Sequence, residues 1–288
     1  MSRVLIIVVT YNGMRWIDKC LSSVAASGAD AFVFDNNSSD GTADYVSEHY
    51  PSMHLVRSES NLGFAGGNNA GFLYALQNGY DAVYLLNQDA WIFPETIPSL
   101  LGLMDANPSF GILSPMQMQA DGVSYNKAFG RDVVPVAKEC ADAPGISEVP
   151  FVMAAHWMVS RRCLETVGIF ASLFSHFGND DNYCHRVLYH GMRIGIVPGQ
   201  KVIHDHEEKQ KTVQQLVSQN YTIGTLVRLC DIRKPLFSGL LQMIPFTFAK
   251  ALRYKSLLPF KSMAAILKQM PEVRRTRKAT RPAGVREV

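Results

Sequence analysis

Three clusters of polar side chains in this sequence have the composition and spacing that could support chemistry. The first follows an apolar run of strand length, residues 83–86, which ends abruptly in Asn87, Gln88 and Asp89. Buried strands of a parallel sheet read as continuous apolar runs, and ligands bind beyond their carboxyl ends. Asp89 is therefore expected at the rim of a cleft, where its carboxylate would suit a hard divalent cation that holds substrate phosphates. An ordinary turn is the alternative, because Asn and Asp commonly form turns after strands.

The other two clusters lie in the second half of the chain. His204 and His206 are two residues apart after an apolar pair, so they could chelate a metal ion, although pairs of surface histidines are the commoner case. Asp180 and Asp181 open a predicted helix, and acidic side chains in a first turn also suit the helix dipole with no further role. Their significance depends on where the fold places them.

A glycine-rich stretch, residues 61–69, adds a candidate ligand loop. Its glycines are Gly63, Gly66 and Gly67, which match neither the dinucleotide-binding GxGxxG pattern nor the P-loop. Hydride transfer and ATP hydrolysis are therefore disfavoured. Close approach of the backbone to a ligand is predicted, with a flexible loop as the alternative.

The elements that would position these residues alternate in the first third of the chain. Apolar runs at residues 3–9, 31–34 and 53–57 predict strands, and residues 14–26, 42–50 and 70–77 predict helices between them. This order predicts an α/β fold with a mostly parallel sheet flanked by helices. Small polar loops end the strands, so they should converge on one edge of the sheet, where a nucleotide would bind.

The second half of the chain is less regular. Residues 94–104 and 212–232 predict helices, and residues 111–119, 151–162 and 192–197 predict strands. Residues 120–148 combine Gly, Pro, Asp and Ala with weak periodicity, which predicts a long loop over the site.

Composition indicates a globular protein with a substantial core, at 47% hydrophobic and 18% charged residues in 288. The five cysteines are odd in number and include no CxxC pair, so a reducing compartment without structural zinc is the simplest interpretation. The apolar run at residues 4–9 is too short for a signal peptide or a membrane span. A cytoplasmic location is expected.

Charge divides the chain unevenly. Residues 1–224 carry a net charge of −8, whereas residues 225–288 hold 14 Lys and Arg against 3 Asp and Glu. Residues 235–270 alternate apolar side chains with Lys and Arg, which suits an interfacial helix on an anionic membrane surface. An amphipathic helical cap or a dimer contact is the alternative. A nucleic-acid partner is disfavoured, because the basic region has no known nucleic-acid motif.

Several motifs, taken in order, resemble the inverting family 2 glycosyltransferases of the GT-A fold. Residues 8–12, 33–42 and 61–71 are similar to the opening strand, the second-strand signature and the nucleotide loop of that family. Asp89 lies at the position of the last acid in its DxD motif, Asp180 at that of the general base, and His204 at that of a metal-binding histidine. The match covers residues 3–210.

The resemblance implies a GT-A-like domain over residues 1–210. The charge and apolar pattern of residues 211–288, which lie outside the resemblance, predict a basic, amphipathic helical extension that ends in a disordered tail. It implies a Mg²⁺ or Mn²⁺ site at Asp89 and His204. The nucleotide-binding residues it implies are Thr10, Tyr11, Asn12, Asp35, Asn37, Asn61, Gly66, Asn68, Asn69, Asn87 and Gln88. His156 and Trp157 could form an acceptor platform, although a core tryptophan is equally consistent.

The implied reaction moves a sugar from a UDP- or dTDP-sugar to a hydroxyl of a glycan or lipid-linked glycan, with inversion, in surface polysaccharide biosynthesis. Asp180 would accept the proton of that hydroxyl. Asn179 and Asn182 stand where the family often has acids, so Asp181 is an alternative base and a nucleotide-sugar-binding protein without turnover is an alternative function. The resemblance leaves oligomeric state open and is consistent with peripheral attachment to the inner membrane face.

Overall fold

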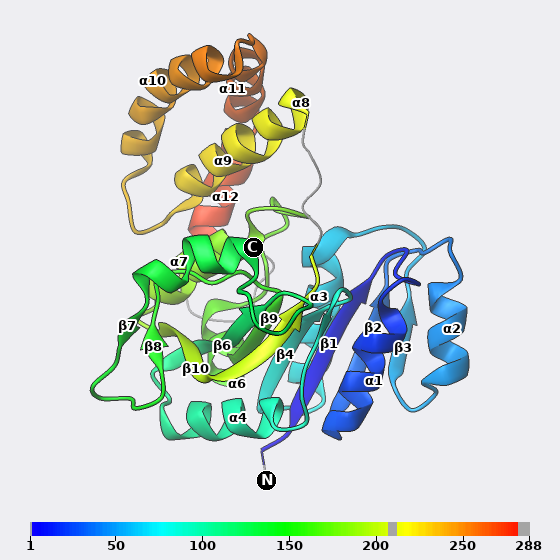
Figure 1. Ribbon diagram of the computed structural model, residues 1–288. Coiled ribbons are helices and arrows are strands. Elements are labelled where there is room, and N and C mark those ends of the chain that lie inside the picture. Colours follow the sequence, from blue (N-terminus) through cyan, green and yellow to red (C-terminus); the bar gives the residue numbers. More distant parts are fainter. Residues whose placement is uncertain (1, 207–211, 282–288) are drawn as a thin grey trace.

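The computed structural model describes residues 2–206 and 212–281, and its first third forms four parallel strands (Figure 1). These are β1 (Val4–Thr10), β2 (Asp30–Asp35), β3 (His54–Arg57) and β4 (Ala82–Asn87), in the spatial order β3-β2-β1-β4. They alternate with α1 (Ile17–Ser27), α2 (Thr42–His49) and α3 (Gly63–Gln77). The predicted alternation of strands and helices is confirmed, and the four strands end at the same edge of the sheet.

The rest of the sheet is mixed, because antiparallel pairs join the parallel ones in this half. β9 (His156–Ser160) runs antiparallel between β4 and β6 (Phe110–Met118), and β10 (Arg193–His204) runs parallel to β6. Three short strands pair antiparallel: β5 (Ala90–Trp91) and β8 (Ser147–Glu148) with β10, and β7 (Lys138–Glu139) with β8. Because β9 is antiparallel to both β4 and β6, these two strands run in the same direction. β10 is parallel to β6, so it ends at the same edge of the sheet as β4.

Helices cover both faces of the sheet. One core cluster joins the sheet to α1, α2 and α4 (Thr96–Ala106), with Ile17, Val46 and Leu100 among its members. The other cluster joins the sheet to α3, α6 (Arg161–Val167) and α7 (Asn179–Tyr189). Burial of these two apolar faces fixes the register of the central strands, β1, β2, β4, β6 and β9, since a slip of one residue would exchange the faces.

Helix α3 begins seven residues earlier than predicted, so the glycine-rich loop is mostly helical. A Cβ on Gly67 would lie 2.7 Å from Val9 Cγ1, and one on Gly71 would lie 2.7 Å from Ile7 Cδ1. These glycines therefore allow α3 to pack closely against β1, rather than keeping a loop flexible.

Two further predictions need correction. Residues 120–148 contain α5 (Lys127–Asp132), the 3₁₀ turn η1 (Val134–Val136), β7 and β8 rather than one long loop. The side chain of Asn126 caps α5 by accepting from the amides of Ala128 and Phe129. β10 continues past the predicted stop at Pro198, because a register shift between Val197 and Lys201 absorbs the irregular residues.

The C-terminal helices form a separate layer beyond the edge of the sheet where β1 ends (Figure 1). They are α8 (Val213–Leu216), the π-helical η2 (Val217–Ile223), α9 (Gly224–Cys230), α10 (Leu236–Tyr254), α11 (Leu258–Lys268) and α12 (Met270–Thr280). A third core cluster, which includes Tyr221, Met243, Ile266 and Val273, joins them to Phe174. Of the predicted disordered tail, residues 282–288 lie outside the described residues. No described helix has both the length and the apolar character needed to cross a membrane.

Candidate active site

Asp89 and His204 come together because a tight turn after β4 leads directly into β5. In the β5–β10 pair, Ala90 stands opposite His204. The Asp205 amide donates to the Asp89 carbonyl at 2.8 Å, which joins the two strand ends. The strand-end position predicted for Asp89 is therefore the observed one, and the pairing with β10 supplies its histidine neighbours.

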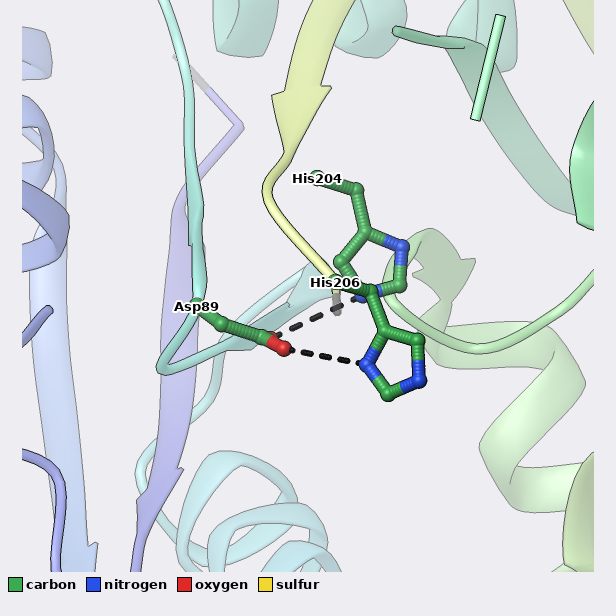
Figure 2. A group of neighbouring side chains, drawn as sticks. All are labelled: Asp89, His204 and His206. Carbon is green, nitrogen blue, oxygen red and sulfur yellow. Dashed lines mark hydrogen bonds and ion pairs between the residues drawn. The ribbon is translucent and has the colours of Figure 1, made fainter. Parts of the chain in front are cut away.

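Asp89, His204 and His206 form a compact group (Figure 2). Asp89 Oδ1 lies 3.6 Å from His204 Nε2, and Oδ2 lies 3.3 Å from His206 Nδ1. Burial alone would raise the pKa of Asp89, but the two neighbouring histidines outweigh burial and hold the pKa well below its usual range. His206 was indicated by its spacing from His204, although the family resemblance implied only His204.

The donor set of this group fits a divalent cation. Its three ligand atoms lie within 4.8 Å of one another. His204 Nε2 is buried and makes no hydrogen bond among the described residues, so a polar atom is left available at the centre of the group. Two imidazole nitrogens and one carboxylate are a common ligand set for first-row metal ions.

Beside this group lies a cleft of about 270 Å³, which is lined by the ends of β1 and β4 and the start of α3. Of the predicted nucleotide-binding residues, it brings together Thr10, Tyr11, Asn61, Asn87 and Gln88. The Gln88 side chain accepts from Thr10 Oγ1 at 2.7 Å and from the Tyr11 amide at 2.9 Å, so it holds the loop after β1 against the end of β4.

Three other predicted residues support the loops beside the cleft without lining it. Asp35 is buried, and its Oδ2 accepts from the Ser38 amide while its Oδ1 has no partner in the described chain. Asn12 and Asn37 adopt positive φ angles of 48° and 65°, which asparagine tolerates better than most residues. Asn12 also accepts from the Ser39 amide and so links the loops after β1 and β2.

Gly66, Asn68 and Asn69, which were also predicted to bind the nucleotide, do not line the cleft. They lie inside α3, where Asn68 is buried and donates to the Phe64 carbonyl. Asn69 exchanges two hydrogen bonds with the backbone of Phe170. The cleft is lined instead by Gly63 and Phe64, at the start of this helix.

The structure places His156 and Trp157, the predicted acceptor platform, in the interior, where both side chains are completely buried. His156 Nε2 donates to the Ile203 carbonyl, so Nδ1 accepts from the Tyr84 hydroxyl. Burial, with the neighbouring His204, lowers the pKa of His156 to about 3 and keeps the ring neutral. His156 therefore holds the end of β10 next to His204 through its hydrogen bond to Ile203, while Trp157 packs in the core.

Asp180 and Asp181 occupy the first turn of α7 and line a second cavity of about 590 Å³. Burial, reinforced by the charge of Asp181, raises the pKa of Asp180 to about 7. Burial also raises the pKa of Asp181. A carboxylate with such a pKa can accept a proton near neutral pH.

Helix α7 is held in place by a buried cation. Arg186 is almost fully buried, and its Nη1 donates to the Ile169 carbonyl at 2.7 Å while Nη2 donates to the Val167 carbonyl. These carbonyls at the end of α6 solvate the guanidinium, although burial still lowers the pKa of Arg186 to about 10. No pattern in the sequence distinguished this arginine from a surface residue.

His176, in the loop before α7, lines both cavities and therefore connects the nucleotide cleft to the carboxylate pair. This loop contacts α3 closely, because a Cβ on Gly63 would lie 2.6 Å from the Ser175 carbonyl oxygen. The sequence carried no signal for His176, since its position depends on contact between distant segments.

Solved structures of similar fold bind nucleotide sugars. Residues of this chain align over 96% of its length with S. aureus TarS 1–349 in complex with UDP-GlcNAc, at 15% identity, a TM-score of 0.58 and 79% coverage of that chain. A mannosyltransferase from Pyrobaculum calidifontis, in complex with GDP-Man and Mn²⁺, aligns over 96% of this chain and 73% of its own, at 20% identity and a TM-score of 0.53. These similarities establish the GT-A fold.

Sequence relatives are glycosyltransferases. The dTDP-rhamnosyl transferase RfbF of Shigella flexneri is 25% identical over 245 residues, which covers 82% of this chain and 75% of that protein. The hexosyltransferase Agl10 of low-salt glycan biosynthesis in Haloferax volcanii is 24% identical over 212 residues, 71% of this chain and 68% of its own. The sequence model of glycosyl transferase family 2 matches residues 5–168, more than half of the chain, and this protein belongs to that family.

Proposed function

We propose that this glycosyltransferase moves a sugar from a UDP- or dTDP-sugar to an acceptor hydroxyl with inversion at the anomeric carbon. The observation that carries the proposal is the relation of the two cavities. One is lined by Asp89 and His206 of the Asp-His-His group, the other is lined by the carboxylate pair, and His176 lines both. Donor and acceptor groups in these cavities would meet between Asp89 and Asp180.

The nucleotide would occupy the cleft at the ends of β1 and β4. Tyr11 is about half exposed there and offers a ring face to the base. Asp35 lies beside the cleft, and its Oδ1 has no hydrogen-bond partner in the described chain; a small shift of the adjoining loop would let it accept from a pyrimidine N3–H or a ribose hydroxyl. Asn61, Asn87 and Gln88 supply further polar atoms.

The donor diphosphate would lie against Asp89, His204 and His206, the residues that would hold Mn²⁺ or Mg²⁺. Such an ion, when bound, offsets the charge that develops on the leaving nucleotide diphosphate. The two imidazole ligands favour Mn²⁺, since Mg²⁺ prefers oxygen ligands and retains its waters.

Asp180 would act as the general base. Its carboxylate would accept the proton of the acceptor hydroxyl while the oxygen attacks the anomeric carbon from the side opposite the diphosphate. A single displacement of this kind inverts that carbon. Asp181, which is adjacent and also has a raised pKa, is the alternative base.

The acceptor would be a glycan or lipid-linked glycan of surface polysaccharide biosynthesis. In support, one relative is named an N-acetylglucosaminyl-diphospho-decaprenol L-rhamnosyltransferase, 26% identical over 134 residues. Helices α10 and α11 contain four Lys and Arg and no acidic residue, and α10 exposes a stripe of apolar side chains. They would attach the enzyme peripherally to an anionic membrane, on the cytoplasmic face, with a second copy of the chain as the alternative partner.

Thermal unfolding in the presence of nucleotides tests the proposal. A ligand that binds the native state raises the melting temperature by mass action. We expect UDP or dTDP, and their sugars, to stabilise the protein more with Mn²⁺ than without it, and NAD and ATP to have little effect. Absence of any shift with a nucleoside diphosphate would contradict the proposal, whereas binding without sugar transfer would favour the nucleotide-sugar-binding alternative.

A further inference from the structure

The cavity that contains the carboxylate pair is built from two parts of the chain. Helix α7 contributes Asp180 and Asp181, and the C-terminal helices contribute Gln219, Asn220 and Arg228. Its volume of about 590 Å³ is within the usual range of small-molecule sites and is large enough for a sugar together with a further group. The catalytic carboxylates therefore face a space that the GT-A domain alone does not enclose.

Two cations line the part of this cavity contributed by the extension. The Arg228 guanidinium lies 4.2 Å above the ring of Phe246 and makes no ion pair with any described residue. Lys234 is 71% exposed, and the nearest carboxylate oxygen, of Asp231, is 4.0 Å away and already accepts hydrogen bonds from Arg233. Both cations are thus available to an anionic ligand.

The cavity wall also includes polar atoms that lack partners. Asn179 is only 4% exposed, and its Nδ2 has no hydrogen-bond acceptor among the described residues. His185 Nδ1 is likewise buried and makes no hydrogen bond there, although it lies 3.9 Å from Asp231 Oδ2. Buried polar groups are normally paired, so this wall suits a polar ligand better than an apolar one.

We propose that this cavity is the acceptor site, and that the acceptor is a phosphate-linked glycan whose phosphate binds Arg228 and Lys234 while its reacting hydroxyl lies against Asp180. The inference rests on the function proposed above and specifies its substrate class. Arginine and lysine together suit phosphate oxygens, whereas an uncharged glycan would leave both cations unpaired. In the transfer, the hydroxyl oxygen bonds to the anomeric carbon, the bond from that carbon to the diphosphate oxygen breaks, and the proton passes to Asp180.

A binding measurement tests the site without turnover. The full chain, saturated with Mg²⁺ and the nucleoside diphosphate that gives the largest thermal shift, is titrated with phenyl phosphate in ligand-observed NMR. We expect binding to the wild type and at least about tenfold weaker binding to Arg228→Gln/Lys234→Gln. Lys261→Gln/Arg274→Gln removes the same charge from α11 and α12, outside the cavity, and should bind like the wild type. The single variant Arg228→Lys, with Lys234 unchanged, should retain most of the affinity for phenyl phosphate.

A kinetic measurement separates the acceptor phosphate from a lipid headgroup. A panel of sugars is offered in matched pairs, as phenoxyundecyl diphosphate esters and as uncharged octyl glycosides, without vesicles. We expect the cavity variant to raise the acceptor KM of the diphosphate ester at least about tenfold, with the KM for the donor unchanged. Binding to vesicles of phosphatidylglycerol and phosphatidylcholine should be equal for the cavity and control variants.

The outcomes distinguish this inference from the function on which it rests. Equal phenyl phosphate binding by wild type and cavity variant, with nucleotide stabilisation intact, would overturn the acceptor-phosphate assignment alone. If no nucleoside diphosphate raises the melting temperature of the wild type, the proposed function itself is rejected. A cavity variant that binds vesicles more weakly than the control variant would assign Arg228 and Lys234 to a lipid headgroup and overturn the inference.

Discussion

Asp180 combines burial, a charged neighbour and access to a cavity, which are the conditions that prepare a carboxylate to act as a base near neutral pH. Asp181 is next in sequence, and its pKa is raised by burial and by the charge of Asp132. The two carboxylates therefore have related but unequal environments, and substitution can distinguish them.

We expect Asp180→Asn to lower kcat by about 10²- to 10⁴-fold, because general base catalysis contributes about that much, and to leave donor binding intact. Asp181→Asn is the matched control, because it removes the same charge with the same change of shape at the neighbouring residue. Steady-state transfer and nucleotide thermal shifts measure the two effects. If Asp181→Asn loses all activity while Asp180→Asn remains active, Asp181 is the general base instead of Asp180.

The pH dependence of kcat/KM provides a second check at this scale. A base must be deprotonated, so kcat/KM should fall as pH decreases below the pKa of Asp180, which is raised to about 7. Asp181→Asn removes a negative neighbour and so should lower that pKa, which moves the acid limb to lower pH. An unchanged limb in Asp181→Asn would contradict this electrostatic coupling.

The Asp-His-His group predicts the metal dependence of donor binding. We expect His204→Ala and His206→Ala each to weaken Mn²⁺ binding by at least about tenfold, measured by isothermal titration in the presence of nucleotide. His190→Ala is a control, because His190 lies at the end of α7 and hydrogen bonds to the Thr280 carbonyl, away from the group. If His206→Ala binds Mn²⁺ like the wild type, the site uses Asp89 and His204 without it.

At the scale of elements, the start of α7 is fixed by its contact with the extension. Gly178 precedes α7 with a φ of 79°, and a Cβ there would lie 2.7 Å from both Ile223 Cγ2 and Val227 Cγ2. The helix that carries the carboxylates therefore packs directly on η2 and α9. This contact joins the GT-A domain to the wall of the second cavity.

Gly178→Ala should destabilise the fold by the cost of a left-handed backbone, about 1–2 kcal/mol, plus about 1–3 kcal/mol for overpacking. Gly191→Ala is a matched control, since Gly191 has a φ of 71° but open space around its Cβ position, so only the backbone cost applies. Denaturant unfolding of both variants measures the difference. If both variants lower the free energy of unfolding equally, η2 and α9 move to accommodate the added methyl group without an overpacking penalty.

At the scale of the whole molecule, α10 has two apolar faces. One face packs within the extension through Met243 and Thr247. On the other, Phe237, Leu241, Ile244, Phe248 and Leu252 are each more than half exposed. At 3.6 residues per turn these five side chains fall within an arc of about 80°. The surrounding α10 and α11 residues add charge of one sign only, which would repel a second copy but attract an anionic bilayer.

We expect the full chain to float with vesicles of phosphatidylglycerol and phosphatidylcholine, and Leu241→Gln/Phe248→Gln to remain in the soluble fraction. Val123→Gln/Val136→Gln removes two exposed apolar side chains from the GT-A domain and should float like the wild type. Salt should weaken flotation, because screening reduces the attraction of lysine and arginine to the lipid headgroups. Equal flotation of both variants, or dimers of the wild type that Leu241→Gln/Phe248→Gln dissociates, would contradict the membrane assignment.

Much of the fold and part of the site could be predicted from the sequence. Apolar runs, and the polar residues that end them, predicted the strands β1 to β4. They also predicted that Asp89 and the Thr10–Tyr11 loop lie close together, because strand ends in a parallel sheet share one edge. The family motifs also indicated His204 and Asp180. These features follow from local pattern, which a single chain displays directly.

Only the tertiary structure decided which polar residues reach a ligand. The glycine-rich residues 61–69 were predicted to form a loop, but α3 begins at Gly63 and packs closely on β1 through Gly67 and Gly71. Asn68 and Asn69 therefore hydrogen bond within the fold. His156 was buried by the pairing of β9 with β4 and β6, and His176 was brought between the cavities by a loop contact. Such placements depend on contacts between residues that are distant in sequence, and no local periodicity encodes them.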